Sequence, residues 1–123
     1  MGRNFNNIKA WQYADDLAVL VYSKTRVFPK EEIYGLTSQL RRAAVSVPAN
    51  ITEGASRNYK KEYLHFLHIA RGSIAEVEYL LHISRRIKYL QENDYKELDV
   101  LRAETAKTLQ GLITFVEKEI DEK

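Results

Sequence analysis

The sequence lacks cysteine altogether and contains no long apolar run. Without cysteine, a disulfide framework, a thiolate zinc site and catalysis by a thiol are all excluded, and we expect the reducing environment of the cytoplasm. No window approaches the roughly 20 apolar residues of a membrane-spanning helix, and the first residues include no apolar segment typical of a signal peptide. We therefore expect a soluble, cytoplasmic protein without a membrane partner.

Motifs of catalysis are equally scarce. The sequence has no glycine-rich phosphate loop, no Gly-x-Ser-x-Gly motif and no spacing that favours a Ser, His and Asp arrangement. Glu62 and His65 form one Glu-x-x-His pair, whereas a carboxylate-bridged di-iron bundle needs two such pairs and two further glutamates. His65 and His68 lie three residues apart without an evident third ligand. We therefore expect no metal, no cofactor and no enzymatic activity.

The length of 123 residues and the hydrophobic content of 45% predict one globular domain over residues 1–123. The net charge of +2 is small, but it is unevenly distributed. Residues 41–89 contain nine basic and four acidic side chains, whereas residues 91–123 contain five basic and nine acidic ones. This asymmetry favours either polyanion binding by the basic part or charge complementarity between helices and subunits.

Apolar residues recur every three or four positions in four segments, as they do on one face of a helix, and no segment alternates like a strand. The predicted helices span about residues 7–25, 31–56, 60–90 and 94–121. Short connections make consecutive helices antiparallel neighbours. The fold class predicted is therefore all-α, an antiparallel up-down four-helix bundle.

Polar residues and one proline mark where these helices begin. Asn6 or Asn7 is expected to cap the first helix, and Pro29 suits the first turn of the second, where its missing N–H is harmless. Asn93 or Asp94 is expected to open the fourth helix, and Glu97 is placed as the capping-box acid for Asp94.

Pro48 stands in the interior of the second predicted helix, where proline costs roughly 3 kcal/mol or more. We expect a kinked helix that strong packing, extending beyond one subunit, holds in place. Two strips beside the core stripes are more apolar than solvent-facing surfaces usually are. They comprise Tyr34, Arg41, Val45, Pro48, Ala49, Thr52 and Ala55 on the second helix, and Ile69, Gly72, Leu80, Ile83, Ile87 and Leu90 on the third. The strips favour a homo-oligomer, and the alternative is a thick core within one chain.

Polar residues follow a third strip of the second helix. We predict a polar network between the second and third helices formed by Gln39, Ser46, Asn50, Glu53, Arg57 and Glu76, and the alternative is that these side chains are simply solvated. Gly72 and Ser73 are small residues in mid-helix. Because glycine there costs about 1 kcal/mol relative to alanine, they predict close packing of another helix.

Cations and flat rings share the outer arc of the third helix. The candidate nucleic-acid-binding residues are Lys61, His68, Arg71, Tyr79, His82, Arg86 and Tyr89, with Arg42 from the second helix. Arginine and lysine neutralise phosphates, whereas tyrosine and histidine stack on unpaired bases. The pattern favours binding of RNA or DNA, and the alternative is an ordinary solvated helix surface.

Residues 28–57 and 62–81 together resemble the 23S ribosomal RNA intervening-sequence protein family, whose members are four-helix bundles. The matching residues are Phe28, Pro29, Glu32, Leu36, Gln39, Arg41, Arg42, Ser46, Asn50, Ile51, Glu53, Gly54, Arg57, Phe66, Ala70, Gly72, Ser73 and Glu76. Thr52 stands where many members have alanine. The family is similar to the accessory variability protein of diversity-generating retroelements, which acts with a reverse transcriptase and RNA.

That resemblance implies a ring-shaped homopentamer, and it leaves two hypotheses about function. In the first, the protein is an oligomeric accessory factor that binds nucleic acid through its basic surface. In the second, it is a structural scaffold that docks a protein partner such as a reverse transcriptase.

Overall fold

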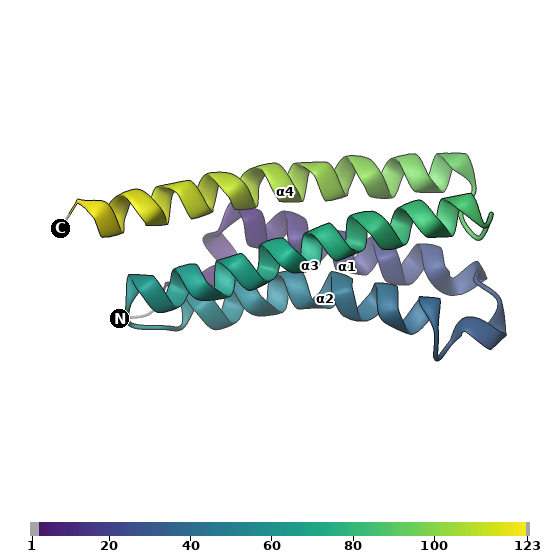
Figure 1. Ribbon diagram of the computed structural model, residues 1–123, viewed down its shortest axis with the longest axis horizontal. Coiled ribbons are helices and arrows are strands. Elements are labelled where there is room, and N and C mark those ends of the chain that lie inside the picture. Colours follow the sequence, from purple (N-terminus) through teal and green to yellow (C-terminus); the bar gives the residue numbers. More distant parts are fainter. Residues whose placement is uncertain (1–2, 123) are drawn as a thin grey trace.

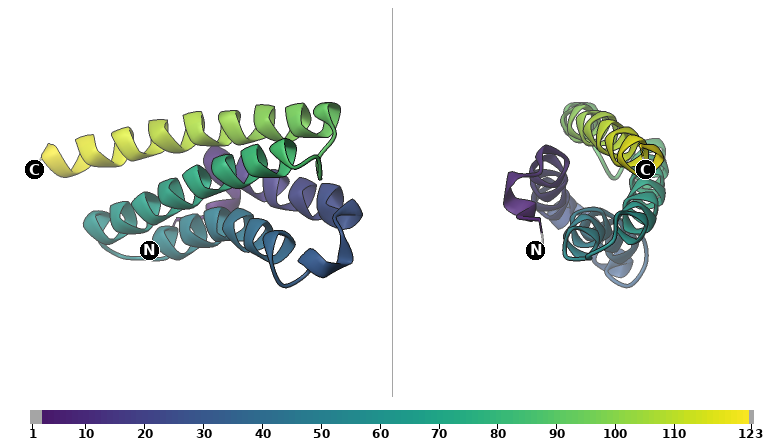
Figure 2. Two further views of the ribbon diagram at one scale, coloured as in Figure 1. Left: turned by 45° about the vertical axis from the view of Figure 1, so that its right-hand side comes forward. Right: turned by 90° about the vertical axis from the view of Figure 1, so that its left-hand side faces the viewer.

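The structure, a computed structural model, describes residues 3–122, and within them the chain forms four α-helices and no strand. The helices are α1 (Lys9–Lys24), α2 (Leu36–Ala55), α3 (Lys60–Arg86) and α4 (Glu92–Asp121), with three short 3₁₀ turns η1 (Phe5–Asn7), η2 (Thr25–Val27) and η3 (Lys30–Glu32). Consecutive helices run antiparallel, and α4 also packs against α1 (Figures 1 and 2). The predicted all-helical bundle is confirmed.

The core lies along the axis of the bundle, and all four helices contribute to it. The large side chains that are fully buried are Leu17, Leu40, Ile51, Leu67, Leu81, Leu98, Leu109, Ile113, Val21, Val47, Val77 and Val116. Among residues 3–122, no helix combines the length and the apolar composition needed to cross a membrane.

The second helix begins later than predicted. Residues 30–32 form the separate turn η3, and the regular helix starts at Leu36 after Gly35, whose φ of −118° and ψ of −116° are not helical. Glu32 explains the break, because its Oε1 accepts a hydrogen bond of 3.0 Å from the Leu36 backbone N–H. A side chain from the preceding turn therefore caps α2.

The third helix ends at Arg86 instead of Leu90. Lys88 adopts φ 68°, in the left-handed region, and its N–H donates to the Arg85 carbonyl at 3.0 Å while the Tyr89 N–H donates to the Ser84 carbonyl at 2.9 Å. These two bonds form a Schellman motif, which usually has glycine at the left-handed position. The sequence has lysine there, so the usual signal for a helix end is absent.

Both predicted caps at polar residues are wrong. Ile8 is the N-cap of α1, and neither Asn6 nor Asn7 caps it. The N-cap of α4 is Gln91, without a side-chain bond. Asp94 and Glu97 instead form ion pairs with Lys24 Nζ, at 2.9 and 3.0 Å. Pairing with a distant helix takes the place of local capping.

Pro48 lies inside α2, which continues through it to Ala55. Proline has no N–H, so the carbonyl one turn back, on Ala44, loses its helical partner. Pro48 is buried within its own chain. The chain itself therefore supplies packing around the proline, and the extension of that packing to a second subunit stays a prediction.

Glu32 also links the two loops at one end of the bundle. Its Oε2 accepts a hydrogen bond of 2.8 Å from the Tyr89 hydroxyl, and the Tyr89 ring packs against Phe28 with centroids 5.4 Å apart. The hydrogen bond from Leu36 and then that from Tyr89 hold the pKa of Glu32 below its ordinary value of 4.5. The same contact with Glu32 raises the pKa of Tyr89 above 10.0.

The depressed pKa predicts a pH-dependent contribution of Glu32 to stability. A carboxylate with a lowered folded pKa stabilises the fold above its unfolded value, and this contribution is lost as pH falls through the folded pKa. We expect Glu32→Gln to be less stable than the wild type at pH 7 and the difference to shrink below about pH 4.5. Urea denaturation between pH 3 and 7 measures it. Glu31→Gln, an exposed neighbour, controls for the loss of one negative charge, and a pH-independent difference for Glu32→Gln contradicts the assignment.

Candidate nucleic-acid interface

The outer arc of α3 brings most of the predicted nucleic-acid-binding residues together. At about 100° per residue, Lys61, His68, Tyr79 and Arg86 fall within roughly 20° of one direction. Arg71 and His82 are expected about 60–80° from it by the same periodicity. All six side chains are exposed. We call Lys61, His68, Arg71, Tyr79, His82 and Arg86 the α3 row.

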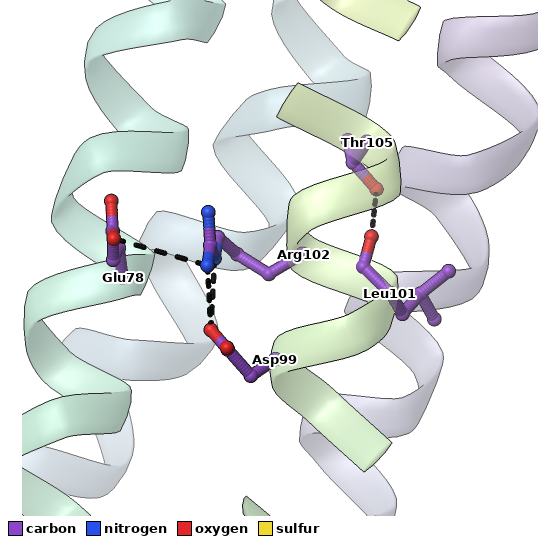
Figure 3. Close-up of polar contacts among 5 residues, drawn as sticks. All are labelled: Glu78, Asp99, Leu101, Arg102 and Thr105. Carbon is purple, nitrogen blue, oxygen red and sulfur yellow. Dashed lines mark hydrogen bonds and ion pairs between the residues drawn. The ribbon is translucent and has the colours of Figure 1, made fainter. Parts of the chain in front are cut away.

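No acidic residue described by the structure belongs to this row. By the same periodicity Glu62 and Glu76 are turned about 60–100° from the centre of the row, on the side opposite Arg71 and His82. Glu78 lies on the side of α4, where Arg102 Nη2 approaches its Oε2 at 3.8 Å (Figure 3). The exposed cations of the row therefore face solvent without a carboxylate between them.

Arg102 belongs to α4 and is held in place by its own helix. It donates to Asp99 Oδ1 from Nη2 at 2.7 Å and from Nε at 3.1 Å (Figure 3), and only 15% of its side chain is exposed. Glu78 is 61% exposed, and so this longer ion pair contributes little to stability. Its effect is to place a positive charge beside the only acidic residue on that flank of the described row.

The flank of the row next to α4 has a shallow hollow of about 310 Å³, lined by Ala75, Glu78, Tyr79, His82 and Tyr95. Tyr79 and His82 stand one helical turn apart, with ring centroids 6.2 Å apart and an interplanar angle of 37°. Tyr79 is 59% exposed. Two rings at this spacing, bordering a hollow, offer a stacking surface for a flat group such as a base.

Arg71 connects the row to α4, because its Nη1 donates to Gln110 Oε1 at 3.1 Å. Arginine has five N–H donors, so most remain for another acceptor. Tyr89 does not belong to the row. It lies beyond the end of α3, where its hydroxyl donates to Glu32 and its ring packs against Phe28. The prediction that Tyr89 lies on the outer arc of the third helix is wrong, because α3 ends at Arg86, whereas its stacking on a base stays a prediction.

Arg42 is exposed, but it lies on α2 and not on the helix that carries the row. Its neighbour Arg41 is half-buried, donates from Nε to Thr25 Oγ1 at 2.9 Å and stacks over Tyr22 with 4.7 Å to the ring centroid. The two arginines thus point to different sides, as their positions on a helix require.

The family model for the 23S rRNA-intervening sequence protein matches residues 6–111. The chain belongs to this family. A solved structure described as a protein with unknown function from the S23 ribosomal protein family of Bacteroides thetaiotaomicron VPI-5482 is similar in fold, with a TM-score of 0.78 over 85% of this chain and 97% of that chain. Its sequence identity of 22% makes this a likeness of fold alone. No curated protein matches the sequence.

The polar residues of this family member form two small clusters instead of one network. Ser46 Oγ and Ser73 Oγ are 2.8 Å apart and join α2 to α3, and Asn50 Nδ2 donates to the Ser46 carbonyl at 2.8 Å and to Ser46 Oγ at 3.0 Å. Glu53, near the end of α2, pairs with Arg57 just beyond the helix at 2.6 Å. The two remaining predicted members, Gln39 and Glu76, are exposed and lie outside both clusters.

Close helix packing occurs at a different glycine from the one predicted. A Cβ added at Gly72 meets nothing within 4 Å, whereas one added at Gly54 lies 2.9 Å from Phe66 Cβ and 3.0 Å from Tyr63 Cδ1. Gly54, near the end of α2, is therefore a point of close approach by α3. Ser73 does face α2, through its contact with Ser46.

The chain itself covers part of each of the two apolar strips. Pro48, Ala55, Leu80 and Leu90 are buried. Exposed apolar residues of the strips are Tyr34, Val45 and Ala49 on the side of α2 and Ile69 and Ile87 on the side of α3. The thick-core alternative thus accounts for part of each strip. Among residues 3–122 no group of three or more His, Asp or Glu side chains could hold a metal ion.

Proposed function

We propose that the protein is a non-enzymatic, oligomeric factor that binds single-stranded nucleic acid through the α3 row. One observation carries the proposal: cations and rings alternate along one exposed arc, whose acidic neighbours Glu76 and Glu78 stand on its two flanks, Glu78 beside Arg102. Phosphates are bound by Lys61, Arg71 and Arg86, with release of counterions. Tyr79 and the histidines stack on bases, which requires no particular sequence.

The length of the row suits an extended strand. From Lys61 to Arg86 the helix rises about 38 Å at 1.5 Å per residue, which is enough to follow several nucleotides. Tyr79 and His82 lie in the second half of this span, and His68 lies in the first. An unpaired strand fits better than a duplex, because its bases are free to lie against Tyr79 and His82.

We propose further that the chain assembles into a homopentamer. The exposed apolar residues of α2 and α3, Val45, Ala49, Ile69 and Ile87, support burial against another copy. A ring would repeat the α3 row once in each subunit. Weak contacts of one row would then add through the high effective concentration of the next.

Native mass spectrometry and fluorescence anisotropy with a 20-nucleotide single-stranded RNA, and a DNA of the same sequence, test both parts. We expect a pentameric mass that retains the RNA at low ionic strength. Arg71→Glu with Arg86→Glu should weaken binding about 10-fold or more. The slope of log K against log salt concentration should become shallower by about 0.7 for each lost phosphate contact. The matched control is Lys96→Glu with Lys107→Glu, which makes the same change in net charge at exposed positions of α4.

An equal loss of binding in the control variant contradicts the assignment of the α3 row, since net charge alone would then explain it. A pentamer that retains no RNA or DNA at low salt contradicts nucleic-acid binding and favours the scaffold that docks a protein such as a reverse transcriptase. A monomer that binds RNA contradicts the assembly and leaves the row in place.

A further inference from the structure

The connection between α1 and α2 encloses a hollow of about 340 Å³. The volume is within the range of small-molecule sites. Three cations line it, Arg26, Lys30 and Arg41, and none of its lining residues is acidic. The nearby Glu32 has both carboxylate oxygens bonded, to the Leu36 N–H and the Tyr89 hydroxyl. The hollow is therefore positively charged and has no counterion in its wall.

Arg41 is fixed in position for binding an anion. Its Nε donates to Thr25 Oγ1 at 2.9 Å, and its guanidinium lies 4.7 Å from the centroid of the Tyr22 ring. Thr25 is itself held, because its hydroxyl donates to the Val21 carbonyl at 2.8 Å. With Nε occupied, the two terminal nitrogens of Arg41 remain as donors, and an arginine so oriented binds oxyanions in a bidentate manner.

Thr37 provides an independent observation. It lines the same hollow, is 3% exposed, and its Oγ1 has no hydrogen-bond partner in the protein. Buried hydroxyls in native proteins are nearly always bonded, so an unpartnered one calls for an explanation. Thr37 and Arg41 stand four residues apart on α2 and so project from the same face of the helix. Thr37 Oγ1 is itself buried, so its side chain must rotate about χ1 before a group bound in the hollow accepts from it as well as from Arg41.

The rest of the wall is apolar and is formed by Phe28, Pro29 and Ile33. Phe28 is 6% exposed and is held by its contact with the Tyr89 ring. One part of the hollow thus suits an anion and the other an uncharged, apolar body. This combination of a few polar groups with an apolar wall is typical of small-molecule sites.

We propose that this hollow binds a small organic phosphate ester, with the phosphate at Arg41 and Thr37 and the organic group against Phe28 and Ile33. A phosphate presents several acceptor oxygens and up to two negative charges, which matches three cations and a hydroxyl better than a carboxylate does. The site lies on the α1–α2 connection, so it is independent of the α3 row and of its proposed function.

Isothermal titration of the full chain with phenyl phosphate at low ionic strength tests the proposal, with inorganic phosphate, benzoate and phenol as separate arms. Phenyl phosphate should bind saturably and more tightly than each of the other three. Thr37→Val and Arg41→Gln should each weaken it about 10-fold, as the loss of a hydrogen bond to a charged group does. The control Arg42→Gln, an exposed neighbour outside the hollow, should change binding less than about 2-fold.

Thr37→Val should also leave the melting temperature unchanged or raise it, because a methyl group of the same shape replaces an unpartnered buried hydroxyl. Arg41→Gln also removes the bond to Thr25, so Thr37→Val decides the question if that variant does not fold. The proposal is overturned if phenyl phosphate does not saturate the protein up to about 10 mM, because a site with so weak an affinity is not specific. Equal binding by Thr37→Val and the wild type overturns it as well, and equal binding of benzoate overturns the assignment of phosphate.

Discussion

Replacing Gly54 with alanine is expected to destabilise the bundle by about 2 kcal/mol. The added Cβ would stand 2.9 Å from Phe66 Cβ, 3.0 Å from Tyr63 Cδ1 and 3.1 Å from the Tyr63 carbonyl oxygen. Two of these three atoms belong to or adjoin the backbone of α3, so a side-chain rotation cannot make room. Overpacking costs about 1–3 kcal/mol, and the upper figure applies to so close a contact. The higher helix propensity of alanine offsets about 1 kcal/mol of this cost.

Tyr63 has little freedom to move away from such a methyl group. It is 3% exposed, and the guanidinium of Arg3 lies 4.2 Å from its ring centroid. The backbone at the start of α3 is further fixed by the hydrogen bond of 3.1 Å from the Tyr63 N–H to the Tyr59 carbonyl. The whole α2–α3 seam would therefore have to widen at this point.

Gly72→Ala is the matched control for Gly54→Ala, and we expect the opposite sign. Nothing lies within 4 Å of a Cβ at Gly72, so only helix propensity acts and stability should rise by about 1 kcal/mol. Urea denaturation of both variants at one protein concentration measures the two effects. A loss of stability in Gly72→Ala, or a change in its oligomeric mass, would show that another copy packs against that position.

The contrast between these two glycines shows where sequence reasoning stops. Both stand in helical segments with apolar periodicity, and the sequence favoured Gly72 as the point of close approach because it lies in mid-helix. Which helix face meets a neighbour depends on how α2 and α3 are placed against each other. That placement follows from the whole core, and no local pattern contains it.

Elements defined by periodicity were predictable, and elements defined by distant partners were not. Four helices follow from the repeat of apolar residues, and so does the exposed arc of α3, because both are set by 3.6 residues per turn. The capping box at Asp94 and Glu97 fits the local pattern equally well. Lys24, on another helix, binds both carboxylates instead, and it is invisible to any local signal.

The candidate sites divide in the same way. The α3 row lies on one helix, so its geometry was accessible from spacing alone. Tyr89 was assigned to it because the helix was continued past Arg86, and the left-handed Lys88 turns the chain away. The hollow beside Arg41 joins residues from η2, η3 and α2, and only the three-dimensional fold brings its three cations together.

In α4, the burial predicted from the apolar repeat is right at some positions and wrong at others. The apolar repeat of its sequence places Leu98, Leu101, Thr105, Leu109, Leu112 and Val116 on one face. The structure buries Leu98, Thr105, Leu109 and Val116. Ile113 is also fully buried, whereas Leu101 and Leu112 are only half-buried. Thr105 tolerates burial because its hydroxyl donates to the Leu101 carbonyl at 2.8 Å (Figure 3).

Leu109→Ala is expected to cost about 2–5 kcal/mol, the range for a leucine removed from a core that collapses only partly. Leu109 is 0% exposed, and it belongs to the helix that closes the bundle against both α1 and α3. A typical domain is stable by only about 5–15 kcal/mol. The variant should therefore lose a large fraction of its stability, measured as a lower urea midpoint with an unchanged slope.

Phe115→Ala on the same helix is the control, because it removes a larger side chain that is 58% exposed. If burial within the chain decides the cost, Phe115→Ala should change stability by less than about 0.5 kcal/mol. A loss as large as that of Leu109→Ala would contradict this, and it would mean that another molecule covers Phe115. If that loss depends on protein concentration, the covering molecule is a second copy of the chain, because association of copies stabilises the fold by mass action.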